Sequence, residues 1–112
     1  MSNKYREFDI NFGLEGRTAL ITGAAAGIGQ AIAVMYAKKG ADIICFDLHE
    51  APETREAVEK CGRKFLQITA DITRDEDIKN AVKTSIEEFG KIDILVNCAG
   101  IGILEKIEEE KD

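Results

Sequence analysis

The chain has 112 residues, of which 45% are hydrophobic and 32% are charged, a composition typical of one folded domain and not of a disordered chain. Its formal net charge of −6 argues against nucleic acids and anionic membranes as partners, because binding to either requires a basic surface. We therefore expect the partner of this protein to be a small molecule.

The cysteines and the N-terminus carry no sign of an exported or metal-binding protein. Cys45, Cys61 and Cys98 lack the spacing of a zinc site or a disulfide framework, and His49 is the only histidine. Residues 1–12 mix charged and apolar side chains without a signal-peptide core. No run approaches the ~18 apolar residues needed to span a membrane. The sequence predicts a cytoplasmic protein without a metal site.

The first third of the chain predicts a strand, a glycine-rich turn and a helix. After an N-terminal arm at residues 1–13, Arg17–Thr22 has the pattern of a buried strand that runs into a glycine cluster. Ile28–Lys39 is predicted to be a helix, and Gly40 follows it where a C-terminal cap belongs. The apolar residues that recur at helical spacing are expected to pack in the core: Ile28, Ile32, Met35 and Tyr36.

Strands and helices alternate along the rest of the chain. Three further short apolar segments are predicted to be strands: Asp42–Phe46, Lys64–Thr69 and Ile92–Val96. Pro52 suits the first turn of a helix, which continues through Glu53–Lys60 between the second and third strands. The sequence therefore predicts a regular alternation of the two kinds of element.

A third helix is predicted between the third and fourth strands. Thr73 and Glu76 have the spacing of a capping box at its start. One helical face is then marked by Ile78, Val82, Ile86 and Phe89, before Gly90. The order β-α-β-α-β-α-β with short connections requires a parallel sheet covered by helices, with right-handed crossovers. We therefore predict the α/β class, with only the first four strands and crossover helices of a doubly wound (Rossmann) parallel sheet.

The segment Gly23–Gly29 lies between the first strand and the first helix, where exposed amides and the positive end of the helix dipole can bind a pyrophosphate. Gly23 allows a sharp exit from the strand, Gly27 lets the backbone approach the phosphates, and Gly29 lets the helix pack closely on the sheet. The alternative is an ordinary glycine-rich turn, which the flanking strand and helix disfavour. The candidate cofactor-binding residues here are Gly23, Ala25, Gly27, Ile28 and Gly29.

Asp47 is the candidate for recognising the ribose of a dinucleotide. It ends the second strand, 18 residues after Gly29, where a carboxylate can accept hydrogen bonds from both adenosine ribose hydroxyls. Asp is also common at the start of a turn, and the two uses can coexist. The 2′-phosphate of NADP(H) would face the like charge of this carboxylate. We therefore predict NAD(H) as the cofactor, with Leu48 also at the site.

Several motifs resemble those of one enzyme family. Thr22–Gly29 matches the pattern T-G-x-x-x-G-x-G of the short-chain dehydrogenase/reductase family. Asn97-Cys98-Ala99-Gly100 is similar to that family's N-N-A-G motif, which supports the sheet and borders the cofactor, and Asp71-Ile72 is similar to its adenine-lining pair. The resemblance covers residues 14–112 and implies a partial NAD-binding Rossmann domain. It adds to the candidate site Asp71, Ile72, Asn97, Ala99 and Gly100.

The chain departs from the family's motif at one position, and two further positions bear on the choice of cofactor. Cys98 stands where the family usually has a second Asn, which bears on one local hydrogen bond and not on the family itself. No His, Lys or Arg adjoins Cys98 in sequence to lower the pKa of its thiol, so we predict a small buried residue and not a reactive thiol. Ala26 and Leu48 occupy positions where NADP-preferring members usually carry a cation, and neither is charged.

The resemblance implies an NAD-dependent oxidoreductase that interconverts an alcohol and a ketone on a small polar substrate. The family's catalytic Ser, Tyr and Lys lie in its second half, beyond Asp112, so no catalytic residue is assigned in this chain. We expect residues 14–112 to be a domain truncated before its catalytic half and inactive alone. Glu53-Thr54 and the segment 62–71 look most like sugar-acid dehydrogenases acting on 2-deoxygluconate or ketogluconates.

Two other functions stay open on the sequence: a non-catalytic nucleotide-binding or interaction module, and a fragment of a 3-ketoacyl-type reductase. The abrupt ending at Asp112 after the apolar strand Ile92–Val96 favours a cut chain over a self-contained module. Family members are usually dimers or tetramers. The open apolar edge of the fourth strand predicts that this chain also forms a homo-oligomer.

Overall fold

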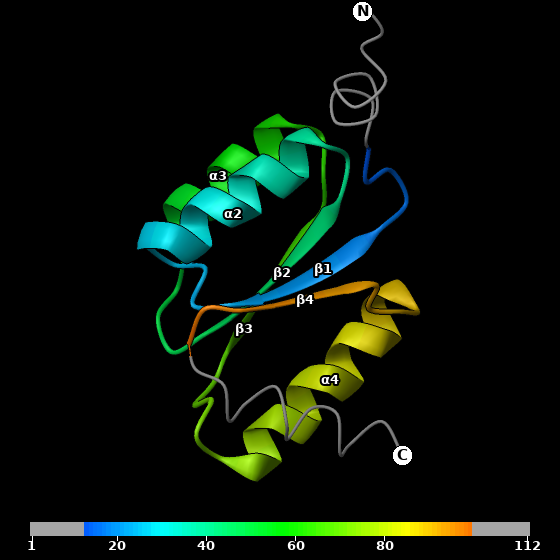
Figure 1. The fold of residues 1–112 in the computed structure, drawn as a ribbon. Helices are drawn as coiled ribbons and strands as arrows, with labels where there is room; N and C mark the ends of the chain where they lie inside the picture. The colour runs from blue at the N-terminus through cyan, green and yellow to red at the C-terminus, as the bar shows by residue number, and fades with distance from the viewer. Residues whose placement is uncertain (1–12, 100–112) are drawn as a thin grey trace, which may run out of the picture.

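The computed structural model of the protein describes residues 13–99, in which strands and helices alternate along the chain (Figure 1). The elements in chain order are β1 (Thr18–Thr22), α2 (Gly27–Lys38), β2 (Asp42–Asp47), α3 (Pro52–Lys60), β3 (Phe65–Thr69), α4 (Asp75–Phe89) and β4 (Ile94–Asn97). The strands form one four-stranded parallel sheet in the order β3-β2-β1-β4. The predicted α/β class and doubly wound sheet are confirmed.

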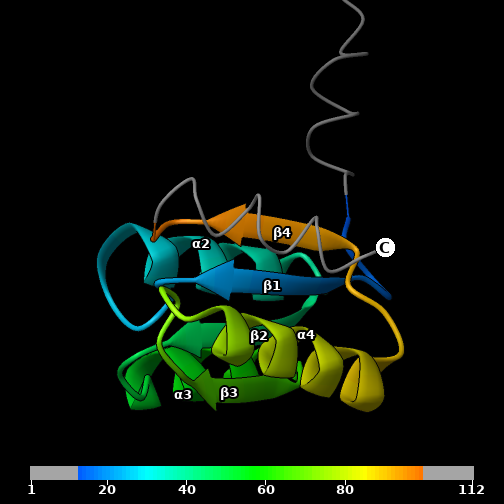
Figure 2. The same cartoon turned by 90° about the horizontal axis from the view of Figure 1, so that it is seen from below.

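The sheet separates two hydrophobic layers. Helices α2 and α3 cover one face of the sheet and α4 covers the other (Figures 1 and 2). Because side chains alternate along a strand, Ile43 and Cys45 pack under α2 and α3, whereas Ile44 and Phe46 pack under α4. Every residue of β1 is buried, as expected for a parallel strand covered on both faces. Packing on both faces of the sheet thus fixes the positions of the carboxyl ends of the strands.

The order of the strands places the start of α2 beside a crevice. From β1 the chain proceeds to β2 and β3 on one side, and it then returns to β4 on the other side of β1. The register pairs Thr22 with Phe46 of β2 and with Asn97 of β4. The ends of these three strands therefore lie side by side at the point where the order reverses. Doubly wound sheets bind their ligands at this position.

The predicted core face of α2 is wrong at two positions. Ile28 is 77% exposed and Met35 is 50% exposed. The buried residues of the helix are instead small: Gly29, Ala33 and Ala37. Ile32 and Tyr36 do pack against the core, but only in part. The helix lies so close to the sheet that only small side chains fit at the contact, and the large residues are turned outward.

The start of α4 also differs from the prediction. Its N-cap is Arg74, and no side chain caps the helix. Thr73 does not form a capping box with Glu76, because its hydroxyl and its amide both donate to the carboxylate of Asp71, at 2.6 and 2.9 Å. Of the predicted apolar face, Ile78 is fully buried and Ile86 is 43% exposed. The turn at Asp71 therefore ends before the helix begins.

Strand β4 begins two residues later than the predicted segment Ile92–Val96 and ends one residue later. Its partner β1 begins at Thr18, and the register sets Ala19 beside Ile94, so Ile92 has no strand residue opposite it. Ile92 packs instead against the core on the α4 side. Within residues 13–99, none of the helices combines the length and the apolar character that a membrane crossing requires.

Candidate cofactor-binding site

The loop between β1 and α2 depends on glycine for two different reasons. Gly23 and Gly27 have φ angles of +75° and +61°, in the left-handed region that favours glycine. A Cβ atom on Gly29 would lie 2.1 Å from the main-chain oxygen of Gly23. A Cβ atom on Gly27 would have no atom within 4 Å. Gly29 thus allows α2 to touch the end of β1, whereas Gly27 faces open space.

Gly29→Ala is therefore expected to lower the free energy of unfolding by about 3 kcal/mol, the upper part of the range for overpacking. The nearest atoms are main-chain atoms, which cannot rotate away. Gly27→Ala is the comparison, and it is expected to lose only about 1 kcal/mol through its left-handed backbone. Urea denaturation measures both variants. Equal losses would show that the contact between Gly29 and Gly23 relaxes without strain.

The first turn of α2 opens toward the same side. Within the described part of the chain, no side chain caps this helix, and no acidic residue stands in its first turn. Ala26, Gly27 and Ile28 are exposed there. The first amide groups of a helix carry a partial positive charge and have no partner within the helix. This end of α2 is therefore suited to bind an anion such as a phosphate.

Asp47 connects the end of β2 to the glycine loop. Its Oδ2 atom accepts a hydrogen bond from the amide of Ala25 at 3.2 Å, and its Oδ1 atom accepts one from the amide of His49 at 2.9 Å. The bond from His49 closes a turn after β2, as predicted for Asp47, and the bond from Ala25 places the carboxylate beside the loop. Leu48 follows and is 56% exposed. A carboxylate next to the loop can also accept a hydrogen bond from a hydroxyl group of a ligand.

The buried hydroxyl of Thr22 joins β1 to the end of β4. It donates to Oδ1 of Asn97 at 3.0 Å, and it accepts from the amides of Cys98 and Ala99 at 3.0 and 3.2 Å. A Cβ atom on Gly23 would lie 3.4 Å from the Cβ atom of Cys98. Asn97 and Ala99 thus lie next to the glycine loop, whereas Gly100 lies outside the described residues.

The three cysteines are free thiols, and they differ in exposure. Cys98 is exposed, which corrects the prediction of a buried residue. It follows the last residue of β4, beyond the cover of the two helical layers, and it joins the Thr22 network through its main-chain amide. Burial in the sheet raises the pKa of the Cys45 thiol to about 12. Cys45 is therefore protonated and unreactive at neutral pH.

Asp71 and Ile72 follow β3, and they are engaged locally. The Thr73 hydroxyl and then the Thr73 amide hold the pKa of the Asp71 carboxyl below its ordinary value. The amide of Asp71 donates to Oδ2 of Asp77 at 2.9 Å. Ile72 packs partly against the core on the α4 side. The structure thus links Ala25 to Asp47, and Thr22 to Asn97 and Ala99, whereas Asp71 bonds to its own turn and to α4.

Sequence reasoning missed Thr54, which is fully buried on α3. Its hydroxyl donates to the main-chain oxygen of Ala24 in the glycine loop at 2.9 Å, and it accepts from Nε2 of Gln30 at 3.0 Å. A signal for this residue exists in the sequence, because Ala51, Thr54 and Val58 recur at helical spacing and so share the buried face of α3. A polar residue on a buried face requires a partner.

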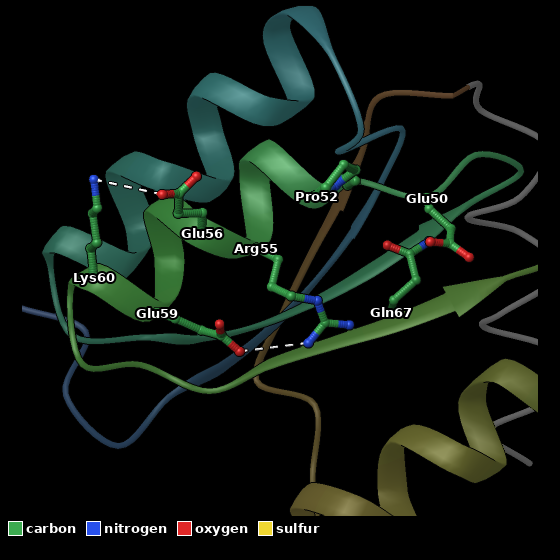
Figure 3. A pocket seen from close by; sticks show the side chains of 8 residues that line it. Glu50, Pro52, Arg55, Glu56, Glu59, Lys60 and Gln67 are labelled. Atoms are coloured by element: carbon green, nitrogen blue, oxygen red, sulfur yellow. Dashed lines mark ion pairs between the residues drawn. The ribbon is translucent and has the colours of Figure 1, made fainter.

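A separate groove of about 500 Å³ lies between α3 and the edge strand β3 (Figure 3). Its lining consists of Glu50, Ala51, Pro52, Arg55, Glu56, Glu59, Lys60 and Gln67. The charges along α3 form ion pairs with each other, Arg55 with Glu59 at 3.5 Å and Lys60 with Glu56 at 3.9 Å (Figure 3). The charges of this groove are therefore largely paired along α3, and Glu50 is one further acidic residue in the lining. None of the predicted site residues lines this groove.

A parallel sheet, a glycine loop at the start of the first helix and an acidic end of the second strand are features of the doubly wound class of proteins, whose members bind dinucleotides at this position. The profile of the family described as short chain dehydrogenase matches residues 17–112. The chain belongs to this family.

Known relatives and structures agree with this assignment. The chain is 47% identical to the 2-dehydro-3-deoxy-D-gluconate 5-dehydrogenase of Dickeya dadantii and 43% identical to that of Escherichia coli. Each alignment extends over 90 residues and covers 80% of this chain and 36% of the relative. A short chain dehydrogenase from Mycobacterium paratuberculosis bound to NAD matches with a TM-score of 0.74 and 33% identity, over 80% of this chain and 39% of that one. The chain thus spans just over a third of each. The resemblance to sugar-acid dehydrogenases is confirmed.

Proposed function

We propose that this chain binds NAD(H) for an NAD-dependent oxidoreductase that interconverts an alcohol and a ketone on a small polar substrate, with sugar acids as the substrate class. One observation carries the proposal: the carboxylate of Asp47 is hydrogen-bonded to the amide of Ala25 in the glycine loop. The acidic group and the phosphate-binding loop are the two halves of a dinucleotide site, and here they are in contact. An ordinary turn residue has no need of this contact.

The residues present fit the parts of NAD(H). The open space at Gly27 and the uncapped start of α2 suit the pyrophosphate. Asp47 would accept hydrogen bonds from the adenosine ribose hydroxyls, and Leu48, Asp71 and Ile72 would lie toward the adenine. The other proposed contacts are Gly23, Ala25, Ile28, Gly29, Asn97, Ala99 and Gly100. The cofactor supplies or accepts the hydride, and the chain contributes binding and orientation.

The sugar-acid substrate rests on the 47% identity to the Dickeya dadantii enzyme, whose name states a ketodeoxygluconate substrate. Identity of this degree extends over 80% of the chain. The matched part makes up 36% of the relative's length.

The 112-residue chain is expected to bind NADH without consuming it. Isothermal titration calorimetry measures the binding, and absorbance at the NADH band in the presence of keto sugar acids measures turnover. Asp47→Ala is the control, because it removes the ribose acceptor and is expected to weaken NADH binding. A chain that binds no dinucleotide would overturn the proposed function. Turnover by the chain alone would contradict the assignment of the chemistry to residues outside it.

A further inference from the structure

The peptide group between Ala24 and Ala25 is held from both sides. Its carbonyl oxygen accepts a hydrogen bond from the Thr54 hydroxyl at 2.9 Å, and its amide donates to Oδ2 of Asp47 at 3.2 Å. All peptide bonds of residues 13–99 are trans, so the carbonyl and the amide of one peptide point in opposite directions. Fixing the carbonyl toward α3 therefore aims the amide at the end of β2.

The Thr54 hydroxyl has its own orientation fixed. It donates one hydrogen, to Ala24, and it accepts a hydrogen bond from Nε2 of Gln30 at 3.0 Å. Because Thr54 is fully buried, water does not compete for either bond. A buried hydroxyl with one donor and one acceptor partner cannot rotate without losing a bond. Thr54 thus acts as a fixed point between α3, α2 and the glycine loop.

We propose that Thr54 is a positioning residue for Asp47, and that it contributes to the preference for NAD(H) through the Ala24 to Ala25 peptide. Without the hydroxyl, the buried carbonyl of Ala24 would lack this donor, and the peptide would turn to find another partner. The Ala25 amide would then leave Oδ2 of Asp47, and the carboxylate would keep only its bond to His49. This inference rests on the proposed function of Asp47 in binding ribose.

Three variants test the proposal by calorimetry with NADH and NADPH. Thr54→Val keeps the shape of the side chain without the hydroxyl, and it is expected to weaken NADH binding about tenfold, the loss that follows when a buried partner is orphaned. NADPH binding is expected to change far less, because NADPH does not use the carboxylate. Thr54→Ser keeps the hydroxyl and should restore the preference. Thr18→Val, at the buried start of β1, is the matched control and should bind both cofactors normally.

The ratio of the two affinities separates positioning from general loosening. If Thr54 only stabilised the loop, Thr54→Val would weaken NADH and NADPH equally, and this result would overturn the proposal. In the Asp47→Ala background, Thr54→Val should no longer change NADH affinity, because the group that it positions is absent. A tenfold loss that persists without Asp47 would also contradict the proposal.

Hydrogen exchange tests the same contact without any cofactor. In Thr54→Val, the Ala25 amide should exchange at least about tenfold faster, while the Ile44 amide in the sheet keeps its rate. Thr18→Val should leave the Ala25 amide unchanged. An Ala25 amide unaffected by Thr54→Val would overturn this inference. Failure of the wild-type chain to bind NADH would instead overturn the proposed function, so the two failures are distinguishable.

Discussion

Replacing Gly27 with valine is expected to abolish dinucleotide binding while leaving most of the secondary structure intact. The Cβ position of Gly27 faces open space at the start of α2, with no atom within 4 Å. A branched side chain there would occupy the place proposed for the pyrophosphate. NADH fluorescence titration measures the binding, and far-ultraviolet circular dichroism measures the helix content.

Gly62→Val is the matched control for this variant. Gly62 has a φ of +77° and also has no atom within 4 Å of its Cβ position, so valine creates the same backbone strain of about 1–2 kcal/mol. It follows α3 at the end remote from the glycine loop. Gly62→Val should therefore lose stability and keep its NADH affinity. Unchanged NADH affinity in Gly27→Val would show that the loop has another role.

The unmodified protein is expected to bind NAD(H) at least ~100-fold more tightly than NADP(H), a difference of about 2.7 kcal/mol. A charged acceptor such as Asp47 contributes on the order of 1.5–3 kcal/mol to a hydrogen bond with a ribose hydroxyl. In NADP(H), a phosphate replaces this hydroxyl, so the bond is lost and a like charge takes its place. Ala26 and Leu48 are exposed and uncharged, and they supply no cation for the phosphate. Calorimetry with both cofactors measures the difference.

Two variants extend this prediction. Asp47→Ala should reduce the gap between the two affinities mainly by weakening NADH binding, because the hydrogen bond to the ribose hydroxyl is lost. Loss of the repulsion should strengthen NADPH binding by a smaller amount. Leu48→Arg in that background should narrow the gap further, since an exposed cation beside the site can pair with the 2′-phosphate. Equal affinity of the unmutated protein for the two cofactors would show that Asp47 serves only the turn to His49.

The strands and helices were predictable because each has a local signal. Buried strands appear as short apolar runs, and glycines stand at the ends of the helices. The side of α2 that faces the sheet was not predictable from hydrophobicity. Ile28 and Met35 are the larger apolar residues, but the contact at Gly29 leaves space only for small side chains such as Ala33. Where a helix packs closely on a sheet, the size of a side chain decides whether it can face the sheet, as well as its hydrophobicity.

Some parts of the candidate site were likewise predictable from the sequence, and others were not. The glycine loop and Asp47 follow from motif spacing, because both are local patterns next to predicted strands. The role of Thr54 depends on a contact with Ala24 that is 30 residues away in the chain. Likewise, the turn at Asp71 competes with the expected capping box of Thr73 through two hydrogen bonds that spacing does not reveal. Contacts between elements become visible only after the chain is folded.

The two hydrogen bonds that Asp47 accepts limit how this protein can be re-engineered toward NADP(H). One oxygen serves the amide of Ala25 in the loop and the other serves the amide of His49 in the turn. No neutral side chain of the same length has two acceptor oxygens. Asparagine has only one acceptor oxygen, and serine has one oxygen on a shorter side chain. Any substitution that removes the charge therefore loses the hydrogen bond to the Ala25 amide in the loop or the one to the His49 amide in the turn. A designer who exchanges the cofactor must also supply a new acceptor for the freed amide, and a 2′-phosphate oxygen is a chemically suitable one.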